Sequence, residues 1–206
     1  MKEERLSLHD IMKTDLQDEL LHGTKVSNLA FQLGRRLGLS YDQALELGIA
    51  GLLHDMGKLK LSRHLYGRDE GHLEVDEIIT ARSHSRIAYD ILMRYDYSDF
   101  ILESILYHHE NYDGTGYPRN LVATDIPYGA RMLRLADAYV SLTSDKPYRK
   151  AFDKDTAVEL MIEEVKNFDM RYFLTFLKMI HEIDVDKVIA FPKFELDFGL
   201  EETKGK

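Results

Sequence analysis

The chain has 206 residues and a formal net charge of −9, and 44% of its residues are hydrophobic. This length and apolar content suit one folded domain and argue against a disordered chain. The acidic balance argues against a protein that coats nucleic acid. Cysteine is absent, so disulfides and thiolate metal sites are excluded, and any metal must be held by histidine and carboxylate.

Neither the first residues nor the apolar runs predict export or membrane insertion. The first residues, MKEERLSLHD, lack the apolar segment and cleavage site of a signal peptide. Apolar runs long enough to span a bilayer are also missing. We therefore expect a cytoplasmic protein that uses neither a membrane nor a nucleic-acid polymer as a partner. We expect a single domain over residues 1–206, with its core at about 15–187 and a C-terminal tail at 188–206.

The spacing of apolar residues predicts an all-α fold of about seven helices packed around one core. The expected helices run from Leu20 to near Gly38, Tyr41 to Asp55, Val75 to about Tyr95, Phe100 to His109, Pro127 to about Asp145, about Asp155 to Lys166, and Met170 to Ile183. The residues expected to form the buried face of the second helix are Leu45, Ile49, Leu52 and Leu53. The polar segment 60–74 is expected to be an ordered loop or flexible lid, and the tail from Val188 is the one stretch that could be extended.

Two pairs of residues with metal-ligating side chains follow apolar runs. His54 and Asp55 lie in LLHDMGK, and His108 and His109 open HHENYDGTGYP. Adjacent residues on a helix point about 100° apart, so neither pair is expected to chelate one ion easily through both side chains. Each pair can instead reach two neighbouring ions, which favours a cluster of two or three metals. The alternative for His54 and Asp55 is a charge pair at a helix end.

Further residues of the same types lie on helix faces. Asp137 lies in the apolar run MLRLADAYV, where a carboxylate is costly unless it is paired or bound to a metal. Asp18 and His22 are four residues apart and share one face of the first helix. Taken alone, His84 is more often a hydrogen-bonded helical residue than a ligand. Asp18 and His22 could equally form a pair on a solvated surface.

Together these segments resemble a known family. LLHDMGK, with the distant His84 and Asp137, resembles the HD superfamily of metal-dependent phosphohydrolases. HHENYDGTGYP and LADAYVSLTSDKPYRKAF resemble the HD-GYP family within it, whose members are phosphodiesterases of the bacterial messenger cyclic di-GMP. The match runs from about His22 to Phe152 with the motifs in the family's order. It implies an HD-domain helical bundle around a metal site, in agreement with the helical periodicity.

The resemblance also implies a role for each matching residue. The implied metal ligands are Asp18, His22, His54, Asp55, His84, His108, His109 and Asp137. Among them Asp55 would bridge two ions, and Asp18 falls where some members place a glutamate that helps to hold a third. Lys58 would assist catalysis without binding metal, which makes Lys58 and Asp55 the catalytic pair. The residues implied to contact the substrate are Gly116, Tyr117, Pro118, Lys146 and Arg149, with Tyr117 beside a guanine base or a phosphate.

The chain departs from the family pattern at three places. Val140 stands where a second aspartate is usual, Lys146 stands where an arginine is usual, and the loop after Lys58 lacks the common proline-bearing pattern. Lysine keeps the positive charge of arginine but loses its bidentate fork on a phosphate. Because no metal ligand is removed, these departures concern the affinity and specificity for substrate more than catalysis.

The expected function is metal-dependent hydrolysis of cyclic di-GMP to pGpG, GMP or both, with a hydroxide that bridges two ions as the nucleophile. The expected cofactors are two or three divalent transition-metal ions, iron or manganese first, with nickel or zinc as alternatives. The alternative functions are an HD phosphohydrolase for another nucleotide and a catalytically weak cyclic di-GMP-binding signalling module. A regulatory protein partner is one expected source of control, and the oligomeric state is left open.

A run of basic residues near the second motif is expected to make the site locally positive for an anionic substrate. These residues are Arg131, Arg134, Lys146, Arg149 and Lys150. The alternative is an ordinary solvated face.

Overall fold

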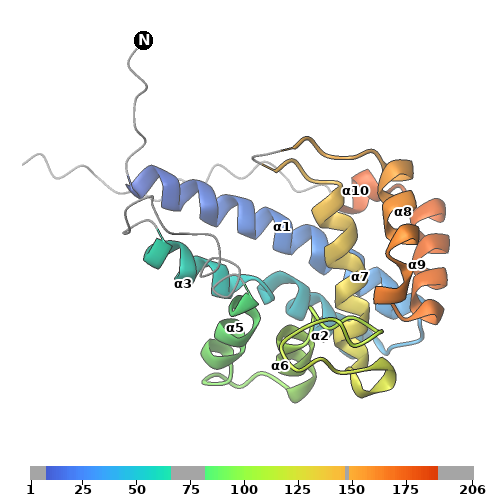
Figure 1. Cartoon of the computed structure of the whole chain (residues 1–206), viewed down its shortest axis with the longest axis horizontal. Coiled ribbons are helices and arrows are strands. Elements are labelled where there is room, and N and C mark those ends of the chain that lie inside the picture. Colours follow the sequence, from blue (N-terminus) through green and yellow to red (C-terminus); the bar gives the residue numbers. More distant parts are fainter. Residues whose placement is uncertain (1–7, 66–81, 147–148, 190–206) are drawn as a thin grey trace, which may run out of the picture.

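The computed structural model describes residues 8–65, 82–146 and 149–189, and the elements named within these ranges are all helices (Figure 1). The α-helices are α1 Leu8–Arg36, α2 Tyr41–Leu53, α3 Met56–Leu65, α5 His84–Leu92, α6 Asp99–Leu106, α7 Tyr128–Leu142, α8 Lys154–Glu163, α9 Met170–Glu182 and α10 Val185–Ile189. Two short 3-10 helices lie at Ala123–Asp125 and Val165–Asn167. The all-α expectation is confirmed. In the described ranges, no helix combines the length and the apolar character needed to cross a bilayer.

The long helix α1 and the central helix α7 organise the bundle (Figure 1). α2 packs along α1 and also contacts α6, which in turn contacts α5 and α7. α9 and α10 contact α1 from the other end of the bundle, and α8 and α9 contact α7. These helices enclose one core, whose fully buried side chains include Leu33, Leu47, Ile105, Leu133 and Phe176. Each of these five comes from a different helix, so the core depends on all of them.

Polar side chains define where several helices begin. Ser40 accepts a hydrogen bond from the backbone N–H of Gln43, and the Gln43 side chain accepts one from the backbone N–H of Ser40, which completes a capping box on α2. Ser98 caps α6 through the N–H of Ile101. Such caps satisfy N–H groups that have no partner within the helix and typically contribute about 1 kcal/mol each.

Each of the seven expected helices has a counterpart, but several end early. α5, α6 and α7 end at Leu92, Leu106 and Leu142, before the expected Tyr95, His109 and Asp145. The residue after α6, Tyr107, has φ −108° and ψ 11°, and its departure from helical geometry frees the two histidines that follow from the helix. The expected start of the third helix, residues 75–81, lies outside the described residues.

α3 and α10 are additional helices that the periodicity did not predict. The expectation of one loop over residues 60–74 was wrong for 60–65, because α3 extends to Leu65; residues 66–74 lie outside the described ranges. α10 makes Val188 and Ile189 helical, so the tail is not extended there, and its remainder lies outside the described residues as well. α3 follows α2 after a turn at His54 and Asp55, where the sequence pattern predicted only the end of a helix.

The predicted buried face of α2 was wrong for two of its four residues, since Ile49 and Leu53 are partly buried against the core. Leu45 and Leu52 are 46% and 41% exposed. The residues that α2 buries are Ala44, Leu47, Gly48, Ala50 and Gly51. Mostly small side chains form this face because α1 packs very closely on it: a Cβ added at Gly51 would lie 2.9 Å from the Cα of Ser27. The periodicity followed the large leucines, whereas close helix packing selects small residues.

Paired alanine substitutions test this assignment of the α2 face. Leu47→Ala should lower the free energy of unfolding by about 2–5 kcal/mol, because it removes a fully buried side chain from the core. Leu45→Ala makes the same chemical change on the exposed side of the helix and should cost about 0.5 kcal/mol or less. Urea unfolding followed by circular dichroism measures both. Equal losses would contradict the assignment.

Candidate metal centre

Seven of the predicted metal ligands meet at one place, although they come from five parts of the chain. They are His22 on α1, His54 and Asp55 at the α2–α3 turn, His84 at the start of α5, His108 and His109 after α6, and Asp137 in α7. Their ligand atoms form two groups, within each of which all atoms lie within 4.8 Å of one another. The first group comprises His22, His54, Asp55 and Asp137, and the second comprises Asp55, His84, His108 and His109.

Asp55 is the residue that the two groups share, and its two oxygens face different groups. Oδ2 lies 3.2 Å from Nε2 of His54 and 3.7 Å from Nε2 of His22. Oδ1 lies 3.2 Å from Nε2 of His84. The side chain is 5% exposed, so water screens it little. One carboxylate therefore lies between two sets of ligand atoms, in the position expected of a bridge.

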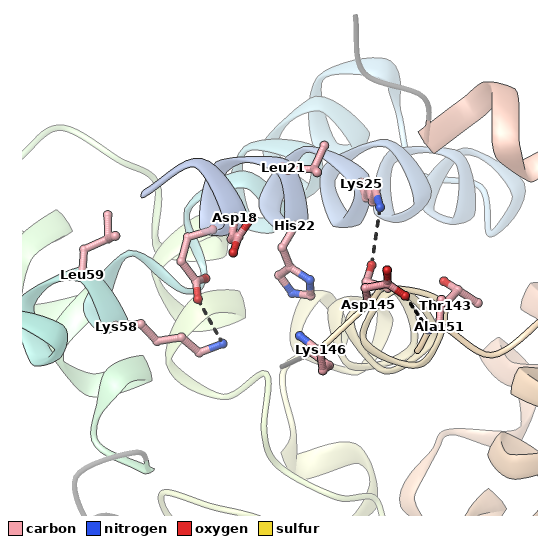
Figure 2. Close-up of a pocket in the computed structure, with 12 residues that line it drawn as sticks. Asp18, Leu21, His22, Lys25, Lys58, Leu59, Thr143, Asp145, Lys146 and Ala151 are labelled. Atoms are coloured by element: carbon pink, nitrogen blue, oxygen red, sulfur yellow. Dashed lines mark hydrogen bonds and ion pairs between the residues drawn. The ribbon is translucent and has the colours of Figure 1, made fainter. Parts of the chain in front are cut away.

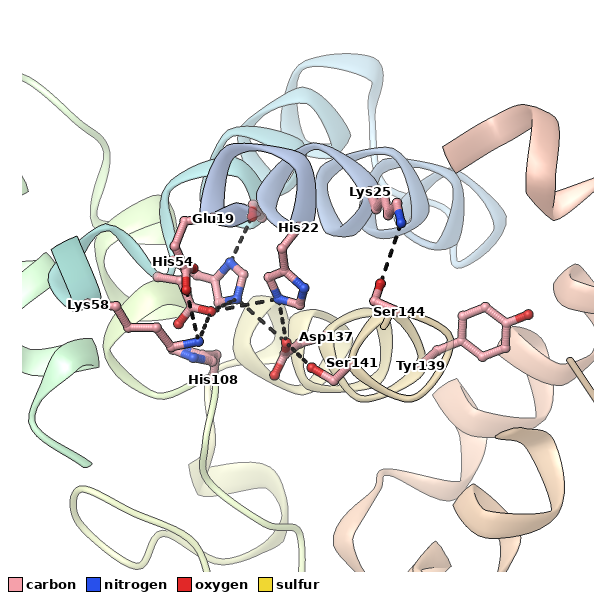
Figure 3. Close-up of polar contacts among 12 residues, drawn as sticks. Glu19, His22, Lys25, His54, Lys58, His108, Asp137, Tyr139, Ser141 and Ser144 are labelled. Atoms are coloured by element: carbon pink, nitrogen blue, oxygen red, sulfur yellow. Dashed lines mark hydrogen bonds and ion pairs between the residues drawn. The ribbon is translucent and has the colours of Figure 1, made fainter. Parts of the chain in front are cut away.

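Asp137 completes the first group from the opposite wall (Figure 3). Its Oδ1 lies 3.1 Å from Nε2 of His22 and 3.6 Å from Nε2 of His54, and it accepts a hydrogen bond from Ser141 at 3.3 Å. The interpretation of Asp18 and His22 as a surface pair does not hold for His22, because its ring faces Asp55 and Asp137 in the interior.

The second group corrects the expectation for the adjacent histidines. His108 and His109 both contribute to this group, with His84 Nε2 at 3.5 Å from Nε2 of His108 and 3.0 Å from Nε2 of His109. The expected separation of about 100° applies only within a helix, and α6 has already ended at Leu106. The turn brings the two ring centroids to 4.0 Å, so both rings can face one ion.

Backbone carbonyls orient two of the rings. His54 places Nδ1 2.8 Å from the carbonyl oxygen of Gly51, and His108 places Nδ1 2.7 Å from that of Ile105. In the neutral tautomer that donates from Nδ1, the lone pair lies on Nε2. Nε2 is the atom that each ring presents to its group, which is the usual arrangement for a metal-ligating histidine.

A close helix contact positions His84. α3 and α5 pack together, and Gly57 of α3 lies against the backbone of His84, where an added Cβ would be only 2.0 Å from the His84 carbonyl oxygen. A side chain at position 57 would therefore push α5 away. The glycine of LLHDMGK thus acts on the site indirectly, by letting α5 bring His84 to Asp55.

The turn after the paired histidines folds back onto them. Gly116 lies so close that an added Cβ would be 2.4 Å from the His109 carbonyl oxygen, and the backbone N–H of Tyr117 donates to that oxygen at 3.1 Å. The buried Glu110, which sequence reasoning did not single out, accepts hydrogen bonds from the N–H groups of Arg119 and Leu121 at 2.6 and 3.0 Å. Its carboxylate holds the two sides of the turn together.

The Tyr117 ring supports His109. The two rings stack with their centroids 4.7 Å apart and their planes 24° from parallel. The guanidinium of Arg82 lies 5.5 Å from the Tyr117 ring centroid. The predicted contact of Tyr117 with a base or a phosphate stays a prediction, and the structure gives this ring a second role as a packing partner of a site histidine.

The model for the HD domain matches residues 7–172 of this chain. The chain belongs to the HD domain family. The chain is 32% identical over 192 residues to the cyclic di-GMP phosphodiesterase PA4108 of Pseudomonas aeruginosa, a match that covers 93% of this chain and 46% of that protein. It is 31% identical over 144 residues to the 3'3'-cGAMP-specific phosphodiesterase 1 of Vibrio cholerae, which covers 70% of this chain and 33% of that one. The chain thus spans less than half the length of these curated relatives.

A solved structure shares the fold. An HDG"Y"P protein from Bdellovibrio bacteriovorus superposes with a TM-score of 0.62 at 19% identity, over 82% of this chain and 56% of that one. At this identity the likeness concerns the fold alone, and it agrees with the HD-domain bundle expected from the sequence.

The charge states of the HD domain site suit metal ligation. At Asp55 and Asp137 burial favours the neutral acid, but the neighbouring histidines prevail and hold the pKa of both carboxyls well below its usual range. Burial lowers the pKa of His108 well below its usual range and that of His109 to about 3. At neutral pH these four residues are therefore ionised carboxylates and neutral imidazoles, the forms that bind metals.

The polar atoms of the site also fit a cation. His54 Nε2 and Asp55 Oδ1 are buried and complete no hydrogen bond to the described residues, a condition that usually costs about 1–3 kcal/mol for each atom. A divalent ion among the ligand atoms would satisfy both. Imidazole and carboxylate together suit iron, manganese, nickel or zinc. The residues present therefore fit two metal ions that share Asp55.

Lys58 and Glu19 lie beside the first group. Lys58 donates to Oδ2 of Asp55, and its Nζ lies 3.9 Å from Oε1 of Glu19. Burial opposes the charge on Lys58, but Asp55 and Glu19 outweigh it and raise its pKa. Sequence reasoning chose Asp18 as the acidic neighbour of His22; Asp18 is exposed and lies outside both groups. Glu19, three residues before His22, was missed although the same helical spacing admits it.

Most residues of the expected basic face form ion pairs or hydrogen bonds with other groups of the protein. Arg131 pairs with Asp169 at 2.7 Å, Arg134 donates to Asn111, and Lys150 pairs with Asp145. Arg149 donates to the carbonyl oxygens of Leu142, Lys150 and Ser141, so its guanidinium lies at the end of α7. Of the five basic residues, Lys146 alone lines the cavity described beside the site. Arg131, Arg149 and Lys150 are thus paired with local acids or carbonyl oxygens, whereas the charge of Arg134 acts on the site and contributes to the lowered pKa of His109. The contribution of this basic run to substrate binding stays a prediction.

Metal content tests the shared position of Asp55. Protein purified without chelators should contain two metal ions per chain by inductively coupled plasma mass spectrometry. Asp55→Ala should lose both ions, because it removes the one residue common to both groups, whereas His109→Ala removes a ligand from one group and should cost at most one. Circular dichroism confirms that each variant is folded. A folded Asp55→Ala variant that keeps both ions would rule out the shared ligand.

Proton release on metal binding tests the charge state of His54. Burial opposes its charge, but Asp55 and Asp137 raise its pKa to about 10 in the metal-free protein. His54 is therefore protonated at pH 8 and must become neutral to bind a metal, so its share of the proton release should be about one proton per chain. The release should fall by about one proton as the pH rises through 10. Calorimetric titration in two buffers of different ionisation enthalpy measures it, and metal uptake without release at pH 8 would contradict the assignment.

Proposed function

We propose that this HD domain is a metal-dependent phosphodiesterase that hydrolyses cyclic di-GMP to pGpG, GMP or both. The observation that carries the proposal is the pair of ligand groups joined by Asp55, with the ammonium of Lys58 directly beside it. A cavity of about 830 Å³ adjoins the first group and is lined by His22 and Lys58 (Figure 2). This size is within the range of about 300–1,000 Å³ typical of small-molecule sites.

The residues of the site match the needs of phosphodiester hydrolysis. When bound, two divalent ions activate water and compensate the negative charge of the phosphoryl oxygens. The histidines and aspartates of the two groups hold such ions at fixed positions. The carboxylates of Asp55 and Glu19 hold Lys58 in its charged form at the edge of the cavity. Lys58 can therefore stabilise charge at the phosphate and provide a proton from Nζ to the sugar oxygen that leaves when the P–O bond breaks.

The choice of cyclic di-GMP rests on the relatives and on the turn at Gly116 to Pro118. The Pseudomonas aeruginosa relative is named for cyclic di-GMP, whereas the Vibrio cholerae relative of nearly equal identity is named for 3'3'-cGAMP. Both are cyclic dinucleotides with two phosphodiester groups, so 3'3'-cGAMP is the second candidate. For the cofactor we propose iron or manganese first, with nickel or zinc as alternatives that the same combination of imidazoles and carboxylates also suits.

Turnover of cyclic di-GMP by the metal-loaded protein tests the function, and the Lys58→Ala variant tests the mechanism. Protein reconstituted without oxygen with iron(II) or manganese(II) should convert cyclic di-GMP to pGpG or GMP, measured by liquid chromatography. Lys58→Ala should keep its metal ions but lose at least about a hundredfold in turnover, a loss typical of a positioned acid or charge-stabilising group. Lys60→Ala is the matched control, since Lys60 is an exposed lysine on the same helix.

Three outcomes separate the alternatives. Preference for 3'3'-cGAMP over cyclic di-GMP would replace the substrate but keep the reaction. Tight binding of cyclic di-GMP to the metal-loaded protein without product would favour a signalling module. Loss of the metal ions from Lys58→Ala, with full turnover per remaining cluster, would contradict the role given to Lys58.

A further inference from the structure

Two walls of the cavity beside the first ligand group face each other, and α3 lines it as well. One wall is α1, and the other is the segment after α7 (Figure 2). On α1, Asp18, His22 and Lys25 all line the cavity, and their spacing of four and three residues places them along one helix face. With a rise of 1.5 Å per residue, Asp18 lies about 6 Å before His22 and Lys25 about 4.5 Å beyond it. The ammonium and the exposed carboxylate thus lie on opposite sides of the site histidine.

Lys25 differs from the other lysines that line the cavity in what it contacts. Lys58 is held by Asp55 and Glu19. Lys25 makes no ion pair with any described residue. Its Nζ donates a hydrogen bond to the neutral hydroxyl oxygen of Ser144 at 3.5 Å. That distance is at the long limit of a hydrogen bond, so an anion could replace the hydroxyl at little cost. Lys25 is partly buried, which strengthens its attraction for an anion relative to a lysine in open solvent.

Lys146 provides a second cation from the other wall. It lines the same cavity, and within the described parts of the chain its side chain makes no ion pair. Asp145 beside it is already occupied by Lys150 and by the backbone N–H of Ala151. Lys25 and Lys146 thus face one cavity from two walls, with their charge available for a ligand.

We propose that Lys25 binds the second phosphodiester of the substrate, the one that is not being cleaved, from the wall opposite Lys146, which the family resemblance already implies to be a substrate contact. This inference rests on the proposed function. A cyclic dinucleotide carries two phosphodiester groups on opposite sides of its ring, so when one lies at the ligand groups the other must lie farther along the cavity. Lys25 lies on that side of His22, away from Asp18. A lysine suits the task because its ammonium is a compact charge on a flexible stem and does not need the fixed geometry of a guanidinium.

Two substrates separate this role from a general effect on the site. Lys25→Ala should raise KM for cyclic di-GMP about tenfold, which corresponds to 1.4 kcal/mol, with kcat within about twofold of wild type, since the contact is expected to be as strong in the bound substrate as during reaction. Bis(p-nitrophenyl) phosphate has a single phosphodiester, so its KM and kcat should not change. Lys25→Arg should restore most of the affinity, and Lys60→Ala should leave both substrates unaffected.

Binding provides a readout that does not depend on turnover. Calorimetric titration with a hydrolysis-resistant phosphorothioate analogue of cyclic di-GMP should give the same tenfold loss for Lys25→Ala, and the loss should shrink as salt screens the contact. Equal losses on both substrates would mean that Lys25 shapes the site, and no loss on either would mean that it does not contact the substrate; both results would overturn the inference while the proposed function stands. If wild-type protein neither hydrolyses cyclic di-GMP nor binds the analogue, the proposed function fails and this inference fails with it.

Discussion

The buried carboxylate of Asp55 is the constraint on which the rest of the site depends. It is almost fully removed from water, and its two oxygens face two different sets of ligand atoms. A buried negative charge is costly unless cations or hydrogen-bond donors surround it. Here His22, His54 and His84 point Nε2 at it, and Lys58 donates to it. An interior that gathers so many polar groups around one carboxylate is built to hold positive charge.

Helix packing positions these groups. His54 and Asp55 lie in the turn between α2 and α3, so their positions follow from how α2 packs on α1 and how α3 packs on α5. Both contacts are close: Gly51 lies against the backbone of Ser27, and Gly57 against that of His84. The small residues therefore act on the metal centre through the backbone. A larger side chain at position 57 would separate His84 from Asp55 without changing any ligand.

Much of this site could be predicted from the sequence because its ligands are conspicuous. Asp137 in an apolar run and His54–Asp55 after one are costly choices for a core without a function, and they predicted a metal site that the geometry supports. Features that depend on where a helix ends, or on how closely two helices pack, were harder to predict from the sequence. The helical 100° rule failed for His108 and His109 because α6 ends before them. Leu45 and Leu52 of α2 were predicted to be buried but are exposed, because mostly small residues make the closest contact with α1.

For other residues the sequence indicated a polar role but did not show which groups the side chain contacts. Asp18 and Glu19 both lie within one turn of His22, and nothing in the spacing shows which carboxylate turns inwards towards Lys58. The expected contact of Arg149 with substrate stays a prediction, and in this structure the backbone carbonyls at the end of α7 accept hydrogen bonds from its guanidinium. Such competition from the protein's own backbone is visible only once the helix ends are known.

The most direct test of the account is anomalous diffraction from crystals of the metal-loaded protein, collected on both sides of the absorption edge of its metal. We expect two anomalous peaks, one on either side of the Asp55 carboxylate, about 3.5–4 Å apart as in two-metal sites. One peak should lie next to His22 and Asp137, and the other next to His84 and His109. A single peak, or two peaks of which one is out of reach of Asp55, would contradict the claim that this carboxylate joins two metal sites.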